Sequence, residues 1–300
     1  MSDIAIIGSG IAGLFSALKL ANAGHEVTVI TKQRLKDSST NWAQGGIAGI
    51  LDKTDIGAKE SHIEDTLKSG DGLCNESMVR EVIEGAAECI FELVNIGVQF
   101  EKNQQGEFKL AKEGGHTERR ILHAKDATGR EIERALSEAA KNHNNISLMR
   151  NTLAIDLIQR DYGNPEQGVC GVWCLDQKSR EVITVKADSV IIATGGVGQL
   201  WSKTTNPGVA TGDGVAMAYR CGAAVKDMAF IQFHPTALTV KNDRPFLITE
   251  ALRGEGGIIL DKRGLAMWEK DCQTAKQLGQ EAPAPSNYSF TLEFSKLGSM

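Results

Sequence analysis

The chain has 300 residues, six of which are cysteine, and its formal net charge at pH 7 is −5. This length allows one large domain or two ordinary ones. The negative charge excludes bulk attraction to nucleic acid or to an anionic membrane surface. The cysteines form no C-x-x-C pair, so we expect reduced thiols, no metal site and a cytoplasmic protein. No apolar run reaches the length of a membrane span. Because the first residues have the pattern of a strand, we expect no signal peptide.

The first thirty residues predict a strand, a tight glycine turn, a helix and a second strand. A short apolar run at 4–7 is typical of a strand buried on both faces. Gly8, Gly10 and Gly13 follow with the spacing G-x-G-x-x-G. In this pattern the first glycine permits the turn, the second admits a pyrophosphate, and the third lets the helix pack closely on the strand. We therefore expect a dinucleotide site at the helix start; the alternative is an αβ unit whose glycines serve packing alone.

The second strand ends at Thr31 and Lys32. An NAD-binding unit carries an acidic residue there, about 20 residues past the glycines, to hold the ribose hydroxyls. Its absence argues against a plain NAD dehydrogenase. The next stretch, residues 38–49, is small, polar and rich in glycine. It predicts a loop, which either connects two elements or presses backbone amides against a flat or anionic ligand.

Helical and strand patterns then follow in order. Asn75 is expected to cap a helix with an apolar stripe over 79–94, which ends at Gly97. A second helix is expected around 132–140. The expected strands, in meander order and followed by a buried strand that ends in glycines, are 146–158, 169–175, 182–185 and 188–196.

Two further places carry polar groups that allow alternative interpretations. Residues 113–131 combine two histidines and four arginines or lysines with several acids around glycines. They form either a solvated charged loop or a carboxylate-binding segment; we expect Arg119, Arg120 and Arg130 to tie the loop to neighbouring acids. Asp213 precedes an apolar helix at 215–221, and it is either the helix cap or a cofactor contact.

Seven motifs occur in one order along the chain: GSGIAG, STNWAQGG, EGGHTERRILHAKDATGRE, ATGG, TTNPGVATGDG, QFHPTAL and TEALRGEG. In this order they resemble the L-aspartate oxidases, a branch of the succinate dehydrogenase/fumarate reductase flavoprotein family. The resemblance runs from Asp3 to about Gly264. It implies an α/β fold, with a Rossmann-like FAD-binding domain that contains a β-meander (1–228), the start of a small α+β capping domain (229–264), and a divergent, poorly ordered tail (265–300).

The cofactor that the resemblance implies is FAD. Family members that bind FAD covalently use a histidine just before the glycine-rich loop; Ser39 stands at that position here, so we expect noncovalent FAD. The residues implied are Ser9, Gly10, Ile11 and Ala12 at the diphosphate, flanked by Gly8 and Gly13; Lys32 near the adenosine half; Ser39, Thr40, Asn41, Trp42, Ala43, Gln44, Gly45 and Gly46 behind the isoalloxazine; Leu153 and Ala154 on the adenine side; Thr194 and Gly195 in ATGG; and Asp213 on the ribityl side.

The activity that the resemblance implies is the oxidation of L-aspartate to iminoaspartate, with oxygen or fumarate as electron acceptor. This is the first step of de novo NAD synthesis, and its product would pass to quinolinate synthase. A glutamate facing the amino group would distinguish aspartate from succinate. The residues implied are Glu113 for the amino group, His234 and Thr249 with Gln232 for the carboxylates, and Glu250 and Arg253 for a proton relay.

One departure from the family pattern bears on activity. The third relay residue in the family is an arginine, and the sequence has no arginine after Arg263. Because family members continue well beyond this point, we expect a C-terminally truncated chain that binds FAD weakly and oxidises aspartate poorly. The alternatives are a soluble fumarate reductase or succinate oxidase, a catalytically dead FAD- or partner-binding remnant, and an NAD-binding Rossmann protein.

Overall fold

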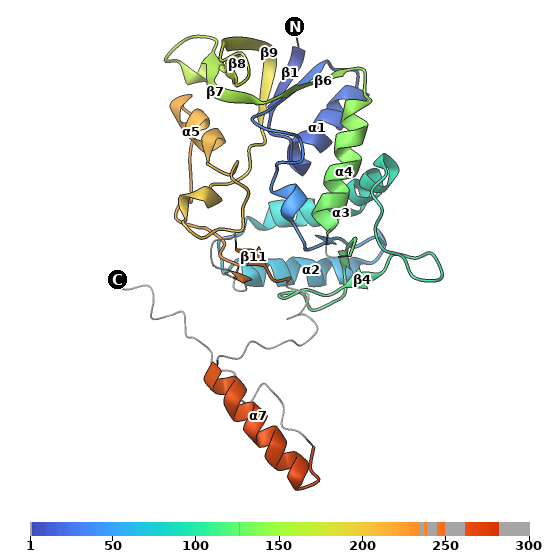
Figure 1. The fold of residues 1–300 in the computed structure, drawn as a ribbon. Coiled ribbons are helices and arrows are strands. Elements are labelled where there is room, and N and C mark those ends of the chain that lie inside the picture. Colours follow the sequence, from blue (N-terminus) through green and yellow to red (C-terminus); the bar gives the residue numbers. More distant parts are fainter. Residues whose placement is uncertain (1, 126, 235–236, 239–244, 250–261, 282–300) are drawn as a thin grey trace. The chain divides into compact units, whose positions relative to one another are not determined.

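The computed structural model describes residues 2–125, 127–234, 237–238, 245–249 and 262–281. The chain divides into two compact units, residues 1–249 and 250–300. A six-stranded sheet organises the first unit (Figure 1). Its strands, from edge to edge, are β6 (Ile146–Arg150), β2 (Val27–Thr31), β1 (Ser2–Ile7), β9 (Val182–Ile192), β8 (Val169–Asp176) and β7 (Thr152–Gln159). The expected α/β fold with a β-meander is therefore confirmed.

The expected strand–turn–helix–strand unit forms at the N-terminus. Strands β1 and β2 are parallel, with Ile6 opposite Val29, and helix α1 (Ile11–Asn22) connects them. Alternate residues of β1 enter two different apolar clusters, Ile6 on one face of the sheet and Ile7 on the other. This is the pattern expected when both faces of a parallel sheet are covered.

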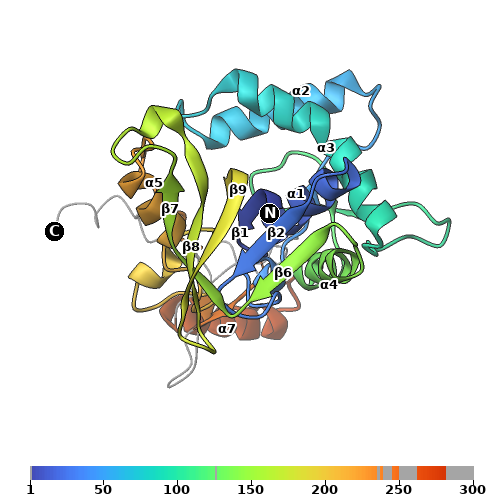
Figure 2. The ribbon, with the colours of Figure 1, turned by 90° about the horizontal axis from the view of Figure 1, so that it is seen from above.

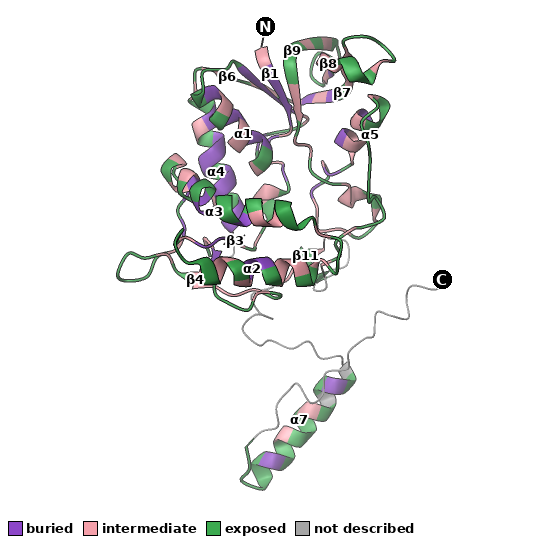
Figure 3. Cartoon of the chain, turned by 180° about the vertical axis from the view of Figure 1, so that it is seen from behind, coloured by how far each residue is buried: buried purple, intermediate pink, exposed green. Residues whose placement is uncertain are grey.

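Helices cover the two faces of the sheet unequally. Helices α1 and α4 (Thr128–Lys141) lie on one face, and the short helix α5 (Asp213–Arg220) lies on the other (Figures 1 and 2). The larger apolar cluster joins α1, α4 and α3 (Glu76–Ile96) to the sheet, and α4 is accordingly buried along much of its length (Figure 3). Asn75 caps α3 and Gly97 ends it at φ 113°, as expected.

The meander differs from the sequence expectation in two places. The expected strand 146–158 is broken at Asn151, whose φ of 54° turns the chain so that β6 joins β2 and β7 joins β8. The two strands expected between 182 and 196 are instead one. The first half of β9 pairs with β8 in antiparallel fashion, and its second half, from Ala187, pairs with β1 in parallel. One long strand thus links the meander to the Rossmann-like sheet.

A small three-stranded sheet and helices α2 and α3 lie between α1 and α4 in the sequence. The order of the small sheet is β3-β5-β4, and helix α2 was not foreseen from the sequence although Asp55 caps it, accepting a hydrogen bond from Ala58 N at 2.9 Å. The loop expected at 38–49 contains one 3₁₀ turn, η1 (Thr40–Trp42), and one strand, β3 (Ile47–Ala48). The other new elements of this region are α2 (Ile56–Ser69), β4 (Leu110–Ala111) and β5 (Ile121–Leu122).

The remaining elements are short, apart from one helix. The first unit also contains η2 (Pro165–Gln167), η3 (Gly198–Leu200), β10 (Ala237–Leu238) and β11 (Phe246–Leu247), the last two forming an antiparallel pair. In the second unit, helix α7 spans Lys262–Gln277. The start of the tail that we expected to be poorly ordered is therefore helical, and 282–300 lie outside the described residues. The expected boundaries at 228 and 264 stay predictions.

Candidate cofactor and substrate site

A cavity of about 610 Å³ lies where β1, β2 and β9 end. In open α/β sheets, ligands bind at the carboxyl ends of the strands, where the strand order reverses direction. The volume is in the usual range for small-molecule sites, about 300–1,000 Å³. The residues of the expected cofactor set that line it are Gly8, Ser9, Gly10, Ile11, Ala12, Lys32, Ser39, Thr40, Leu153, Ala154, Thr194, Gly195 and Asp213.

Close packing requires glycine at two of the three positions of the glycine turn, Gly8 and Gly13. A Cβ atom on Gly8, whose φ is 117°, would lie 2.1 Å from the carbonyl oxygen of Ala193. A Cβ atom on Gly13 would lie 2.0 Å from the carbonyl oxygen of Gly8. Both positions therefore require glycine for the contact of α1 with the strand ends. At Gly10 the nearest atom would be the Thr40 hydroxyl oxygen at 3.1 Å, a tight but milder contact.

The start of α1 carries one hydroxyl beside its backbone amides. The Ile11 amide donates to Thr40 Oγ1 at 2.9 Å. Since a threonine hydroxyl both accepts and donates, its proton is available to an anion at this helix start. The Ser9 hydroxyl is used differently, because it is buried and lies 3.0 Å from both Thr31 Oγ1 and the Leu35 carbonyl oxygen. Only the backbone of Ser9 is thus suited to a cofactor contact.

Lys32 and Asp213 form an ion pair on the wall of the cavity. Lys32 Nζ lies 2.6 Å from Asp213 Oδ2 and 2.6 Å from Thr211 Oγ1. Burial raises the pKa of Asp213, but the hydrogen bonds from Lys32 and Thr211 outweigh it and hold that pKa below its usual range. The resemblance had placed the two residues at different parts of the cofactor; in the structure their side chains are in contact. Asp213 also does not cap α5, because the cap position is Gly212.

These residues fit a dinucleotide such as FAD. The turn supplies helix-start amides and a hydroxyl for a diphosphate. The ion pair of Lys32 and Asp213 lies on the wall of the same cavity and offers polar groups to the rest of a dinucleotide. Leu153 and Ala154 supply apolar wall at the start of β7. A site with few polar groups at chosen points of a mostly apolar lining is typical of cofactor pockets.

The glycine-rich segment, residues 38–46, borders this cavity and a second one. The second cavity, of about 280 Å³, is lined by Ser39, Asn41, Trp42, Ala43 and Gln44 together with Arg130, Asn206, Pro207 and Phe246. Helix α4 packs against the segment so closely that a Cβ on Gly129 would lie 1.9 Å from the Thr40 carbonyl oxygen. The segment is therefore fixed between two cavities by a helix, and Ser39 lines both.

The start of the segment is held by a buried carboxyl group that sequence reasoning missed. Glu133 on α4 is 2% exposed and accepts hydrogen bonds from Ser38 Oγ at 2.8 Å and Ser137 Oγ at 2.9 Å. Burial raises the pKa of Glu133 to about 7, although both hydroxyls and the charge of Lys141 act to lower it. The available signal was a glutamate and a serine four residues apart beside the apolar face of a helix.

The end of the segment is held by Glu113. Its Oε1 accepts a hydrogen bond from the Gly46 amide at 3.1 Å, and a Cβ on Gly45 would lie 3.3 Å from the same oxygen. A Cβ on Gly46 would lie 2.2 Å from the Leu122 carbonyl oxygen, so only glycine fits against β5 there. The structure thus brings Glu113 to the segment expected behind the isoalloxazine.

The other expected substrate residues lie in the later part of the first unit or outside the described residues. Gln232 is exposed, and His234 and Thr249 are half-buried. Phe233, beside His234, packs edge-on against Trp201 with ring centroids 5.4 Å apart. Glu250 and Arg253 lie outside the described residues.

Further residues line the main cavity that sequence reasoning had not assigned. They are Ile7, Ile30, Thr31, Asp37, Ser38, Thr152, Ile192, Ala193, Val209, Ala210, Gly214, Val215, Met217, Ala218, Ala224, Val225, Lys226 and Met228. For the lining residues on β1, β2 and β9, the signal in the sequence was their place at the end of a parallel strand.

Over the described part of the chain, each helix is too short or too polar to cross a bilayer. The same part contains no group of three or more His, Cys, Asp or Glu side chains that could hold a metal ion.

Comparison with known proteins gives consistent matches. The model of the FAD binding domain family matches residues 3–289. The chain is 45% identical over 258 residues to L-aspartate oxidase 1 of Ralstonia nicotianae, covering 85% of this chain and 48% of that protein. It is 43% identical over 263 residues to the L-aspartate oxidase of Vibrio cholerae, covering 86% of this chain and 49% of that protein. The chain therefore spans about half the length of these relatives.

A solved structure with the same fold is a fumarate reductase. The chain matches the E. coli quinol fumarate reductase chain FrdA with a TM-score of 0.81 at 30% identity, covering 94% of this chain and 46% of that one. Sequence and structure comparisons thus agree on the fold, while the relatives by sequence carry the more specific name.

Proposed function

Because the chain belongs to the FAD binding domain family, we propose that it is the flavin-binding part of an L-aspartate oxidase, which oxidises L-aspartate to iminoaspartate with oxygen or fumarate as acceptor. The observation that carries this proposal is the contact of Glu113 with the Gly46 amide, which places a carboxylate at the glycine-rich segment. The names of the relatives point the same way. Iminoaspartate would then pass to quinolinate synthase, in the synthesis of NAD.

The residues that would hold FAD are those of the main cavity. Backbone amides of Ser9, Gly10 and Ala12 would bind the diphosphate together with the Thr40 hydroxyl, which already accepts the Ile11 amide. Lys32 would lie near the adenosine half, as the resemblance implies. Bound FAD would supply the redox chemistry of the reaction, a two-electron oxidation of the substrate coupled to reduction of the acceptor. The chain itself supplies binding, orientation and protons.

On the substrate side, the chain would recognise an ammonium group and two carboxylates. A carboxylate at Glu113 accepts charge-assisted hydrogen bonds from an ammonium group, and succinate offers no such donor. His234, Thr249 and Gln232 would serve the substrate carboxylates, as the resemblance implies. We keep Glu250 and Arg253 as proposed proton-relay residues.

The test is a difference spectrum of the chain saturated with FAD, titrated without oxygen with L-aspartate and separately with succinate. We expect a saturable change in the flavin band with L-aspartate at lower concentration than with succinate, and Glu113→Gln should abolish that preference. A stronger response to succinate would favour a succinate oxidase or fumarate reductase instead. Retained flavin without a response to either acid would contradict the oxidase proposal and leave a flavin-binding module.

A further inference from the structure

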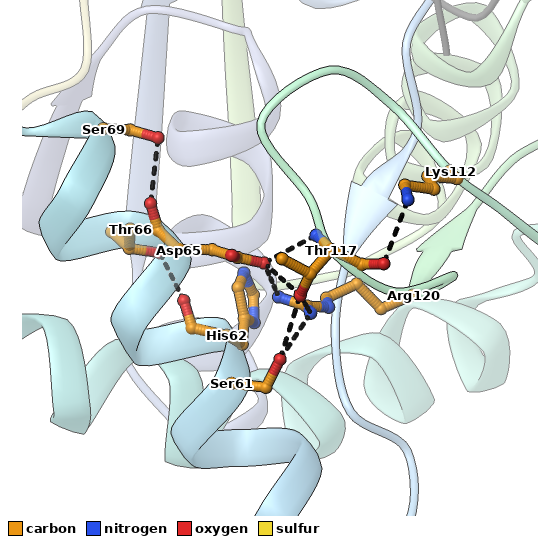
Figure 4. Close-up of polar contacts among 8 residues, drawn as sticks. All are labelled: Ser61, His62, Asp65, Thr66, Ser69, Lys112, Thr117 and Arg120. Atoms are coloured by element: carbon orange, nitrogen blue, oxygen red, sulfur yellow. Dashed lines mark hydrogen bonds and ion pairs between the residues drawn. The ribbon is translucent and has the colours of Figure 1, made fainter. Parts of the chain in front are cut away.

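The loop that carries Glu113 is anchored on a helix outside the cofactor cavity. Residues 112–120 connect β4 to β5, each of which is two residues long. Asp65 on α2 accepts hydrogen bonds from the Thr117 amide at 2.8 Å and from the Thr117 hydroxyl at 2.9 Å (Figure 4). The Lys112 ammonium group donates to the Thr117 carbonyl oxygen at 3.0 Å. Thr117 is thus the point where the loop is tied to α2.

Arg120 strengthens this anchor from inside the protein. Its side chain is 1% exposed, and Nη1 lies 3.0 Å from Asp65 Oδ2. Its Nη2 donates to Ser61 Oγ at 3.2 Å and to Thr117 Oγ1 at 3.3 Å (Figure 4). Asp65 and Arg120 therefore both hydrogen-bond to Thr117 and contact each other.

The backbone of Arg120 connects the same loop to Gly49, three residues beyond the glycine-rich segment. Its amide donates to the Ala111 carbonyl oxygen at 3.2 Å, and its carbonyl oxygen accepts from the Gly49 amide at 3.0 Å. One residue thus joins α2, β4 and Gly49, which directly follows β3. A shift of Arg120 would move both partners of the Glu113–Gly46 contact.

The electrostatics make Asp65 the required partner of Arg120. A buried guanidinium group costs free energy unless a negative charge compensates it. Burial raises the pKa of Asp65, but the hydrogen bonds from Thr117 and the charge of Arg120 outweigh it and hold that pKa below its usual range. Neighbouring His62 does not compete as a cation, because burial, Arg120 and His116 lower its pKa to about 4. The His62 and His116 ring centroids are 5.5 Å apart.

We propose that Asp65 and Arg120 are a positioning pair, which fixes the 112–120 loop so that Glu113 stays against Gly46 and selects a substrate bearing an ammonium group. The selection of a substrate with an ammonium group rests on the proposed function, whereas the positioning of the loop does not. Two of the three residues between Glu113 and Thr117 are glycines, Gly114 and Gly115, and Gly115 has a φ of 83°. Because glycine gives the backbone much freedom, the anchor at Thr117 is needed to restrict Glu113.

The experiment compares Asp65→Asn with Arg80→Met in the 300-residue chain. Asp65→Asn keeps the shape of the side chain and removes the charge. The control removes the exposed pair between Arg80 Nη1 and Glu60 Oε1, 2.8 Å apart, which ties the same helix to α3. We measure hydrogen exchange in peptides covering 45–49 and 112–120, and the dissociation constants of L-aspartate and succinate with FAD saturating.

We expect Asp65→Asn to speed exchange in both peptides and to reduce the preference for L-aspartate over succinate by about tenfold or more, the loss typical of one charge-assisted hydrogen bond. The succinate constant should change little, and Arg80→Met should change none of these quantities. If the unsubstituted chain shows no preference for L-aspartate, the proposed function fails, and the exchange result alone decides whether the pair positions the loop.

Unchanged exchange in both peptides of Asp65→Asn would overturn the positioning pair, whatever the substrate result. Faster exchange with a retained preference for L-aspartate would overturn the selectivity role. If Asp65→Asn does not fold, Thr117→Val decides by the same readouts, because it keeps both charges and removes only the hydroxyl that Asp65 and Arg120 share.

Discussion

The glycine-rich segment is held at its two ends by carboxyl groups in different surroundings. At the start, Glu133 is buried among hydroxyl groups, and burial raises its pKa to about 7. At the end, Glu113 bonds the Gly46 amide from a loop that the ionised pair of Asp65 and Arg120 anchors. At the first end, the Glu133 carboxyl group has hydroxyl groups and no cation as hydrogen-bond partners. At the second end, the buried charge of Arg120 must be compensated by Asp65. We therefore expect substitutions at the two ends of the glycine-rich segment to differ in the size of their effect on stability. We expect the pH dependence of stability to have opposite sign at the two ends.

The largest expected difference is between Asp65→Asn and Glu133→Gln, each of which replaces a carboxyl group by an amide of the same shape. Removing one partner of a buried ion pair costs about 3–5 kcal/mol of unfolding free energy, and Arg120 would be left buried without its counter-charge. A glutamine at 133 can still bond both serine hydroxyls, so we expect a change within about 1 kcal/mol. Urea unfolding at pH 7 measures both, and equal losses would refute the contrast.

A second expected difference concerns stability as the pH rises. The folded-state pKa of Glu133, about 7, lies above its ordinary value of 4.5, so the folded protein binds the proton more tightly than the unfolded chain. The contribution is full below about pH 4.5 and is lost as the pH rises through 7. Between pH 5 and pH 8 this loss amounts to about 2–3 kcal/mol. Unfolding free energies of the unsubstituted chain should fall over this range relative to those of Glu133→Gln; parallel curves would show that Glu133 has an ordinary pKa.

At the anchor of the other end, the expected pH dependence has the opposite sign. The pKa of His62 is lowered from 6.5 to about 4 by burial and by the charges of Arg120 and His116, so the unfolded chain takes up the proton first. Stability is therefore lost as the pH falls below about 6.5. At pH 5 the loss is about 2 kcal/mol relative to pH 8. His62→Gln, which does not titrate, should lack this loss, and an equal acid sensitivity in both chains would contradict the assignment.

The parts of the fold that the sequence predicted are those that depend on near neighbours. The β1–α1–β2 unit follows from glycine spacing and apolar periodicity within thirty residues. The cap at Asn75 and the stop at Gly97 are likewise local. The expectation of one unbroken strand at 146–158 and of two strands between 182 and 196 was wrong. Pairing with β2 and β1, which are far away in the chain, decides where these strands begin and end.

The candidate site divides in the same way. The cofactor turn was predictable from its motif, whereas Glu133 and Asp65 were not, because their partners are distant: Ser38 and Glu133 are 95 residues apart, and Asp65 and Thr117 are 52 apart. The prediction that Arg120 ties its loop to an acid is confirmed, but which acid required the fold. Glu113 came from the family resemblance, and its role toward an ammonium group stays a prediction. A charge in a sequence does not show whether it will be buried, and burial decides its effect.

The smallest expected effect is on the affinity for FAD, which we expect to depend on the start of the glycine-rich segment and not on the anchor of its end. Thr40→Val removes the hydroxyl that accepts the Ile11 amide at the start of α1. Thr66→Val, the matched control, removes a hydroxyl that bonds the His62 carbonyl oxygen within α2, on the anchor of the other end. One ordinary hydrogen bond contributes about 0.5–1.5 kcal/mol, which corresponds to about 2- to 12-fold in a dissociation constant. Fluorescence titration should therefore show FAD binding weakened by that factor in Thr40→Val and unchanged in Thr66→Val. If both substitutions weaken FAD binding equally, the cofactor senses both ends of the segment, and the division between a cofactor end and a substrate end would have to be given up.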